Sequence, residues 1–195
     1  MADENRNYKA VDGHLFSHDG SRLIKYAPAQ EAGSYRIPDG TVIIESNAFE
    51  NAKNLTEVIL PDSLEEIGHT AFLYCENIKA VNFGNGLKTI KGQAFGFCDS
   101  LTEVILPDSV EKVSYSAFSN CERLEKVTIG SGVTHIGNGA FRECKALKEV
   151  VFKDTEKWSM IGAYWLVSKK IDVSDPAKNA ENLTGEYCEL SLNKR

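Results

Sequence analysis

The hydrophobic residues of this chain recur at a fixed interval of 23 residues. Five phenylalanines follow this spacing without an insertion, and an alanine precedes each of them. Six further positions of the interval are hydrophobic or small in all five copies, apart from Thr41, which is the single polar exception. A unit of 23 residues cannot bury so many hydrophobic side chains alone, so neighbouring units must stack on one another. The pattern therefore predicts a solenoid whose interior contains Phe49, Phe72, Phe95, Phe118 and Phe141.

Within each unit, one segment has the alternation that is typical of a β-strand. In residues 55–60, Val58 and Leu60 are expected to point inward while the residue between them points outward. Pro61 and its equivalent Pro107 then end the strand, and turn-forming residues follow. A second short extended piece is expected at 64–67 on the opposite face. The Ala-Phe-x-x-Cys stretch after it is too short for more than a turn or two of helix.

The order of these positions resembles a known family of repeats. A leucine or isoleucine, often followed by proline, precedes an isoleucine, an Ala-Phe pair, a cysteine and a leucine, as in the BspA-like (Treponema pallidum-type) bacterial leucine-rich repeats. The resemblance covers Ile37 to Phe152. It implies a β-rich α/β solenoid, a right-handed superhelix with 23-residue repeats and one parallel strand per repeat on one face. It also implies a non-catalytic interaction or adhesion module of a bacterial cell-surface or secreted protein, with a protein or glycan macromolecule as partner.

The flanks of the repeats differ in composition and predict two caps. Residues 1–36 are expected to form an N-terminal hairpin cap, with the turn at Asp19-Gly20. Five repeats occupy 37–152. Residues 153–195 are expected to form a C-terminal cap, in which Asp175-Pro176 starts a short helix and residues 187–192 supply a last strand. Such caps cover the exposed core and the sheet edges at the ends of a solenoid.

Charge and hydropathy exclude several classes of function. The chain has 28 acidic and 22 basic residues and a net charge of −6, which disfavours binding to nucleic acid or anionic lipid. Its longest apolar run, residues 163–167, is far too short to cross a membrane. The polar start lacks the apolar stretch of a secretory signal. The extracellular or cell-surface location therefore comes from the resemblance, and a cytoplasmic protein is the alternative.

The cysteine and histidine residues do not predict a metal, a cofactor or a catalytic site. The spacing of stacked strands would permit disulfides in the column Cys75, Cys98, Cys121 and Cys144. Ala52 occupies the same column, however, so buried reduced thiols are expected there, while Cys188 is left open. His14 and His18 lie on one strand more than ~10 Å apart, too far to share an ion, and both are expected to be surface residues. Since no catalytic motif is present, the chain is not expected to be an enzyme.

The outward positions of the strands are the candidate partner-binding surface. Unlike the inward columns, they vary from repeat to repeat, as a recognition surface requires, although ordinary solvent-facing positions vary too. Stacked strands would join them into one continuous surface. β-branched residues are also common in strands for reasons of conformation alone. A structural spacer or an intracellular scaffold is the alternative function, and a monomer is expected. The candidate residues are Glu57, Ile59, Glu103, Ile105, Lys126, Glu149 and Val151.

Overall fold

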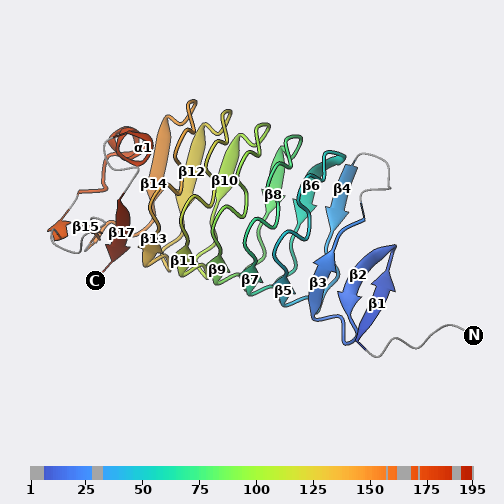
Figure 1. Ribbon diagram of the computed structural model, residues 1–195. Helices are drawn as coiled ribbons and strands as arrows, with labels where there is room; N and C mark the ends of the chain where they lie inside the picture. The colour runs from blue at the N-terminus through green and yellow to red at the C-terminus, as the bar shows by residue number, and fades with distance from the viewer. Residues whose placement is uncertain are drawn as a thin grey trace, which may run out of the picture.

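The chain forms a solenoid in which each turn contains two short strands (Figure 1). Each strand is parallel to the equivalent strands of the neighbouring turns. The computed structural model describes residues 7–27, 33–156, 158–161, 168–170, 172–185 and 190–194. About five turns of 23 residues stack along one axis, and the described residues contain a single nine-residue helix. The solenoid, its repeat length and its parallel strands are as the hydrophobic pattern predicts.

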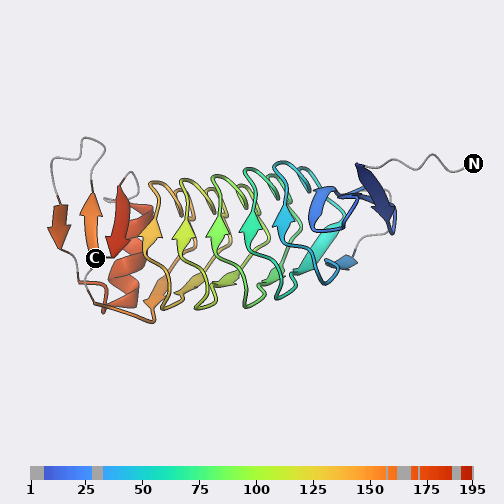
Figure 2. The same ribbon diagram turned by 90° about the horizontal axis from the view of Figure 1, so that it is seen from below.

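Two rows of strands line two faces of the solenoid. We call the row of longer strands the first face; it consists of β4 (Gly33–Arg36), β6 (Leu55–Ile59), β8 (Ala80–Asn82), β10 (Glu103–Ile105), β12 (Lys126–Ile129) and β14 (Glu149–Phe152). The second face consists of two-residue strands, which Figure 2 shows side by side: β5 (Ile43–Ile44), β7 (Glu66–Ile67), β9 (Thr89–Ile90), β11 (Lys112–Val113) and β13 (His135–Ile136). Partners across each paired junction of the five repeats are 23 residues apart, as for Val58 and Val81. The second face corresponds to the second extended piece expected from the sequence.

The Ala-Phe-x-x-Cys stretches form hydrogen-bonded turns in place of the turn or two of helix that the sequence allowed. In each stretch, residues two before and two after the phenylalanine have positive φ, which interrupts a right-handed helix. The freed backbone groups pair between turns of the solenoid: the amide of Phe72 donates to the carbonyl of Ala94 at 2.7 Å, and Phe95 donates to Ala117 at 2.8 Å. These turns therefore add to the hydrogen bonding between repeats.

The phenylalanine column is a continuous stack in the core. Ring centroids of successive members lie 4.5, 4.8, 5.2 and 5.6 Å apart, and the planes are within 15° of parallel. All five rings are buried. The expectation that these rings form the interior, and not an exposed aromatic strip, is confirmed.

The cysteine column lies next to this stack, and its four thiols are free and buried. Each thiol donates a hydrogen bond to the carbonyl oxygen of the phenylalanine in the preceding repeat, for example from Cys75 to Phe49 at 3.0 Å and from Cys121 to Phe95 at 3.1 Å. Burial raises the pKa of Cys75 to about 12 and that of Cys121 well above its usual range. These residues act as small core residues, as the sequence indicates. Cys188 lies outside the described residues.

Thr41 is fully buried, and its hydroxyl oxygen has no hydrogen-bond partner. The other members of its column are leucine or valine, so the cavity is shaped for an apolar side chain. We expect Thr41→Val to raise the free energy of unfolding by ~1 kcal/mol, because the isosteric change removes an unsatisfied buried hydroxyl. Denaturant melts measure this change. Thr41→Ser is the control, since it keeps the hydroxyl, loses a methyl group and should lower stability; a destabilised valine variant would contradict the assignment.

From β6 to β12, the turns that follow the first-face strands alternate between two types. Residues 61–63 and 107–109 read Pro-Asp-Ser, whereas 84–86 and 130–132 read Gly-Asn-Gly and Gly-Ser-Gly. The Asp62 carboxylate accepts a hydrogen bond from the amide of Asn85 at 2.7 Å, and Asp108 accepts one from Ser131 at 2.9 Å. A Cβ on Gly86 would lie 1.9 Å from the carbonyl oxygen of Asp62. Each glycine turn thus packs directly on the backbone of the proline turn before it.

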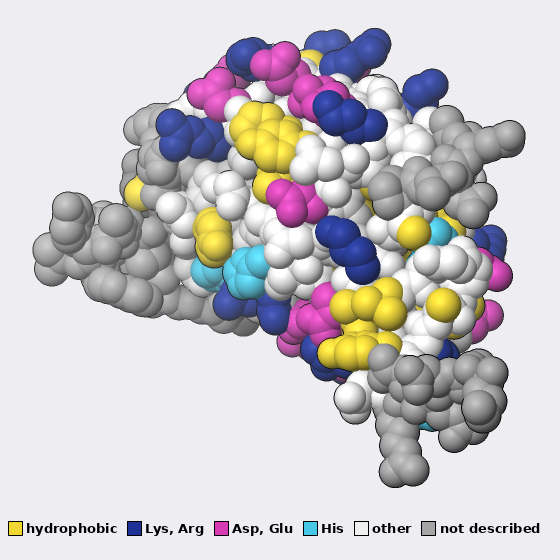
Figure 3. Space-filling view, turned by 45° about the vertical axis from the view of Figure 1, so that its right-hand side comes forward, with side chains coloured by type: hydrophobic (Ala, Val, Ile, Leu, Met, Phe, Trp, Pro, Cys, Tyr) yellow, Lys and Arg dark blue, Asp and Glu magenta, His cyan; other side chains and the backbone are white. Residues whose placement is uncertain are grey.

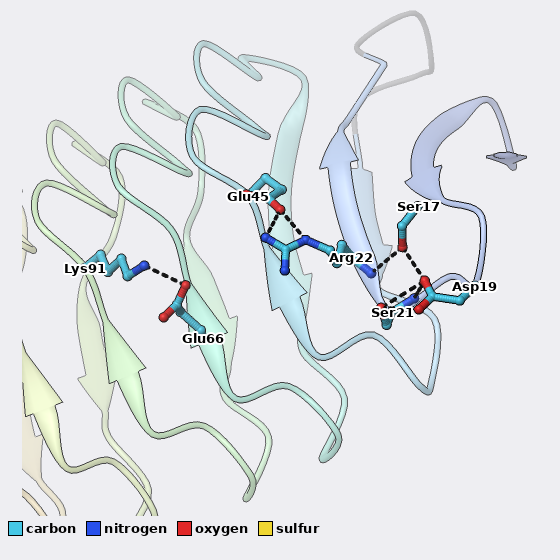
Figure 4. Close-up of polar contacts among 7 residues, drawn as sticks. All are labelled: Ser17, Asp19, Ser21, Arg22, Glu45, Glu66 and Lys91. Carbon is cyan, nitrogen blue, oxygen red and sulfur yellow. Dashed lines mark hydrogen bonds and ion pairs between the residues drawn. The ribbon is translucent and has the colours of Figure 1, made fainter. Parts of the chain in front are cut away.

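The N-terminal part consists of three strands that continue the second face. β1 (Tyr8–Val11) and β2 (His14–Ser17) pair antiparallel, β2 pairs with β3 (Arg22–Lys25), and β3 is parallel to β5. Asp19 in the second turn accepts hydrogen bonds from Ser17 and Ser21 (Figure 4). These bonds lower the pKa of the Asp19 carboxyl to about 2. The hairpin thus covers the N-terminal edge of the second face.

His14 is buried, so its interpretation as a surface residue is wrong. Its ring stacks on Tyr26 with centroids 4.6 Å apart, and Tyr26 stacks in turn on Phe49 at 4.8 Å. Burial lowers the pKa of His14, and its Nδ1 accepts a hydrogen bond from the amide of Ala27. The sequence contained a signal for this packing, because Tyr26 lies 23 residues before Phe49 and continues the aromatic column. His18 is exposed, as expected.

The C-terminal part covers the last turn of the solenoid (Figure 1). It contains β15 (Trp158–Ile161), β16 (Ser168–Lys170), α1 (Pro176–Thr184) and β17 (Ser191–Lys194). Asp175 caps α1, as its position before Pro176 predicts. β17 pairs with β13, while buried Asn179 of α1 donates hydrogen bonds to the carbonyls of Val150 and Val173. The last strand of the second face is thus covered by β17, and the last strand of the first face, β14, contacts α1. Residues 187–189, Tyr164 and Trp165 lie outside the described residues.

Candidate interaction surface

The seven candidate residues all lie on the first face, in two of its columns. Strand register places Glu103, Lys126 and Glu149 side by side, and Ile105 beside Thr128 and Val151 in the next column. The remaining two candidates, Glu57 and Ile59, lie on β6, whose neighbours are β4 and β8. The two groups belong to separate three-stranded sheets, β4-β6-β8 and β10-β12-β14.

The prediction of one continuous strand surface therefore needs correction, because no strand pairing joins β8 to β10. Between β6 and β8, the backbone amide of Lys79 donates to the carbonyl of Thr56 at 2.8 Å, and the amide of Leu60 donates to the carbonyl of Asn82 at 2.9 Å. The same two bonds recur between β10 and β12, from the amide of Glu125 to the carbonyl of Thr102 and from the amide of Leu106 to the carbonyl of Thr128. Within the described residues, neither equivalent bond forms between β8 and β10, so the sheet is split there.

Phe83 accounts for the position of this split. The equivalent positions in the other four repeats are isoleucine or leucine: Ile37, Leu60, Leu106 and Ile129. The larger Phe83 ring packs edge-on against Phe95, with centroids 5.8 Å apart. The second face stays continuous at this level, since β7, β9 and β11 remain paired. The bulky ring thus separates the repeats on the first face only.

The split opens into a groove with a volume of about 710 Å³, which we call the β8–β10 groove. Val81, Phe83 and Ile105 contribute apolar surface to its lining. Lys79, directly before β8, and Glu103, the first residue of β10, also line it. Ile105 is 54% exposed, the largest exposed fraction among the large hydrophobic residues of the described chain. Its equivalent Ile59 is half-buried, although the nine residues 55–63 and 101–109 are identical in sequence.

The charges around the groove are mixed in sign. Asp108 and Lys153 form an ion pair at 2.9 Å at its far end, and hydrogen bonds from the Ser131 amide and Lys153 lower the pKa of Asp108. Among the described residues, Lys79 and Glu103 take part in no ion pair. Lys126 pairs with Glu149 at 3.3 Å on the strands beyond. The groove therefore presents one free cation and one free anion on opposite walls.

Elsewhere on the surface, several ion pairs join adjacent turns. Glu66 and Lys91 lie 2.7 Å apart, and Arg22 pairs with Glu45 (Figure 4). On the face shown in Figure 3, basic and acidic side chains are interspersed, and hydrophobic side chains form small separate patches. Exposed pairs of this kind contribute little stability individually.

The groove was missed from the sequence, although one signal was present. Lys79, Thr102 and Asp108 line it together with Ile105, which was a candidate residue. The replacement of leucine or isoleucine by Phe83 in a core column was visible in the sequence. Its consequence for strand pairing depends on packing in three dimensions and could not be obtained from the period alone.

The described part of the chain contains no cluster of three or more histidine, cysteine, aspartate or glutamate residues arranged to bind a metal. In the same residues, no helix is long and apolar enough to cross a membrane. The arrangement on the first face thus offers hydrogen-bonding backbone, apolar contact and mixed charge, which are the elements of noncovalent recognition.

Comparisons with known structures show proteins of the same architecture. The pneumococcal vaccine antigen PcpA is 30% identical with a TM-score of 0.71, over 79% of this chain and 39% of that one. A leucine-rich cell-surface protein of Faecalibacterium prausnitzii is 29% identical with a TM-score of 0.69, over 77% of this chain and 40% of that one. The leucine-rich repeat protein of T. pallidum is 28% identical with a TM-score of 0.64, over 75% and 69%.

This chain thus spans about two fifths of the length of the first two of these proteins. A search of curated proteins found no match. The family model of the BspA type leucine rich repeat region matches residues 30–148, which is more than half of the chain. This match begins before Ile37, in keeping with Tyr26 as an earlier member of the aromatic column. The chain belongs to the BspA-type leucine-rich repeat family.

Proposed function

We propose that this chain is a non-catalytic module of a bacterial cell-surface or secreted protein, and that its first face binds a protein or glycan partner. The observation that carries the proposal is the contrast between the two sides of the strands. The inward columns stay hydrophobic or small apart from Thr41, whereas the outward columns mix residue types, as Glu57, Ala80 and Lys126 do in one of them. The outward positions include Ile105, which is 54% exposed. An apolar residue so exposed has no role in the core, and such residues are common in interaction sites.

Similarity to known proteins supports the location. Two of the similar structures are described as a vaccine antigen of pneumococcus and as a cell-surface protein. Such molecules meet other macromolecules outside the cell, where a rigid solenoid with a broad face is suited to binding. A structural spacer is the second candidate, favoured by the ion pairs that join adjacent turns elsewhere on the surface.

Binding to arrays of purified extracellular matrix proteins and of glycans tests the proposal. We expect saturable binding to a member of the array, weakened at least tenfold in the double variant Ile59→Thr and Ile105→Thr, which keeps β-branching in both strands. Thermal melts should show that the variant is folded. Lys112→Ala is the control, because Lys112 is exposed on the second face. Absence of saturable binding would favour the spacer, and equal loss in the control would move the site away from the first face.

A further inference from the structure

We propose that the β8–β10 groove binds an extended polypeptide segment of a partner protein. The segment would lie over the groove, form main-chain hydrogen bonds to the unpaired backbone groups of the split and place an apolar side chain against Ile105. This inference rests on the proposed function and adds to it the site and the chemical class of the ligand.

The backbone of the groove is the first argument. In parallel sheets, alternate residues of a strand direct their amide and carbonyl groups to opposite neighbours. Thr102 and Leu106 are bonded toward β12, and Asn82 is bonded toward β6. The groups of Val81, Glu103 and Ile105 consequently face the split, where no strand pairing takes them up. Some Cα atoms of β8 and β10 lie within 8 Å of one another, which is less than the ~9.6 Å that a strand inserted between them would require. A ligand that lies over the groove can instead reach these unpaired groups with hydrogen bonds.

The size and lining of the groove are the second argument. Its volume of about 710 Å³ lies within the ~300–1,000 Å³ range of ligand-binding clefts. Ile105 and Val81 offer apolar contact between the two strands, whereas the ring of Phe83 is almost wholly buried and cannot serve as a stacking platform for a sugar. The lining therefore favours alternating apolar and polar side chains on a main chain.

Charge complementarity is the third argument. Lys79 and Glu103 lie on opposite walls, and neither has an ion-pair partner within the described residues. A polypeptide can carry an acidic and a basic group together and so match both walls. A polyanion, such as a nucleic acid or a sulfated glycan, would meet the carboxylates of Glu103 and Asp108 in addition to Lys79. The groove thus fits a peptide of mixed charge better than a chain of one sign.

The test uses a phage-displayed library of random decapeptides as the probe, selected on the whole chain. We expect enriched peptides whose affinity falls at least tenfold on Ile105→Asp but less than threefold on Ile59→Asp. The two isoleucines are matched controls, because they occupy the same column and lie in identical nine-residue sequences. Thermal melts of both variants establish that they are folded. N-methylation of alternate peptide amides should also weaken binding at least tenfold.

Several results would overturn the proposal. One is a failure to enrich peptides, and another is an equal loss of affinity in both isoleucine variants. Unchanged affinity after N-methylation would exclude main-chain hydrogen bonds from the peptide. If the array experiment finds a partner while the peptide selection fails, the groove assignment is wrong and the proposed function remains. If both experiments fail, the proposed function itself is wrong.

Discussion

Replacing Phe95 with alanine is expected to lower the free energy of unfolding by ~3–5 kcal/mol. Phe95 is fully buried and stacks between Phe72, at 4.8 Å, and Phe118, at 5.2 Å, so the cavity would interrupt contacts with both neighbouring repeats. Loss of coupling between central repeats should affect the whole solenoid, because each repeat is stabilised mainly by its neighbours. Denaturant melts followed by circular dichroism measure the change.

Tyr115→Ala is the control for this variant. The Tyr115 side chain is large and aromatic, but it is 48% exposed, and its loss should cost less than ~1 kcal/mol. A cost below ~1 kcal/mol for Phe95→Ala as well would contradict the central place of the aromatic stack.

Gly86→Ala is expected to destabilise the protein by ~1–3 kcal/mol, although it adds only one methyl group. The new Cβ would lie 1.9 Å from the carbonyl oxygen of Asp62, so the backbone of one of the two turns must move. That movement would also disturb the hydrogen bond from the Asn85 amide to the Asp62 carboxylate. Thermal and denaturant melts of the purified variant measure the effect.

Gly33→Ala is the matched control for the glycine variant. A Cβ on Gly33 would meet no atom within 4 Å, and its backbone is not in the left-handed region, so the change should stay within ~0.5 kcal/mol. Equal effects at the two positions would show that the close packing of the turns is not what requires glycine at position 86.

The fold could be predicted from the sequence because its core is strictly periodic. Each inward column repeats a hydrophobic or small residue at the same interval, apart from Thr41, so the register of Phe95 or Val58 needs no information from distant parts of the chain. The cap was harder to predict, because burial of His14 depends on Tyr26 lying across the end of the stack. The split of the first face was not predicted, since identical segments containing Ile59 and Ile105 lie in different environments. A local pattern cannot report a difference that arises from the neighbouring repeat.

The alternation of proline and glycine turns has a consequence for how this chain can change in length. Because the glycine turns at 84–86 and 130–132 each fit onto a preceding Pro-Asp-Ser turn, two successive repeats form one 46-residue module. Removing residues 60–105 would bring together sequences that already match across the deletion and would leave a proline turn before a glycine turn. Deleting residues 106–128 alone would place the glycine turn at 130–132 on the glycine turn at 84–86, without the Pro-Asp-Ser turn onto which it now fits. Recombination and protein engineering should therefore tolerate removal of residues 60–105 better than removal of residues 106–128.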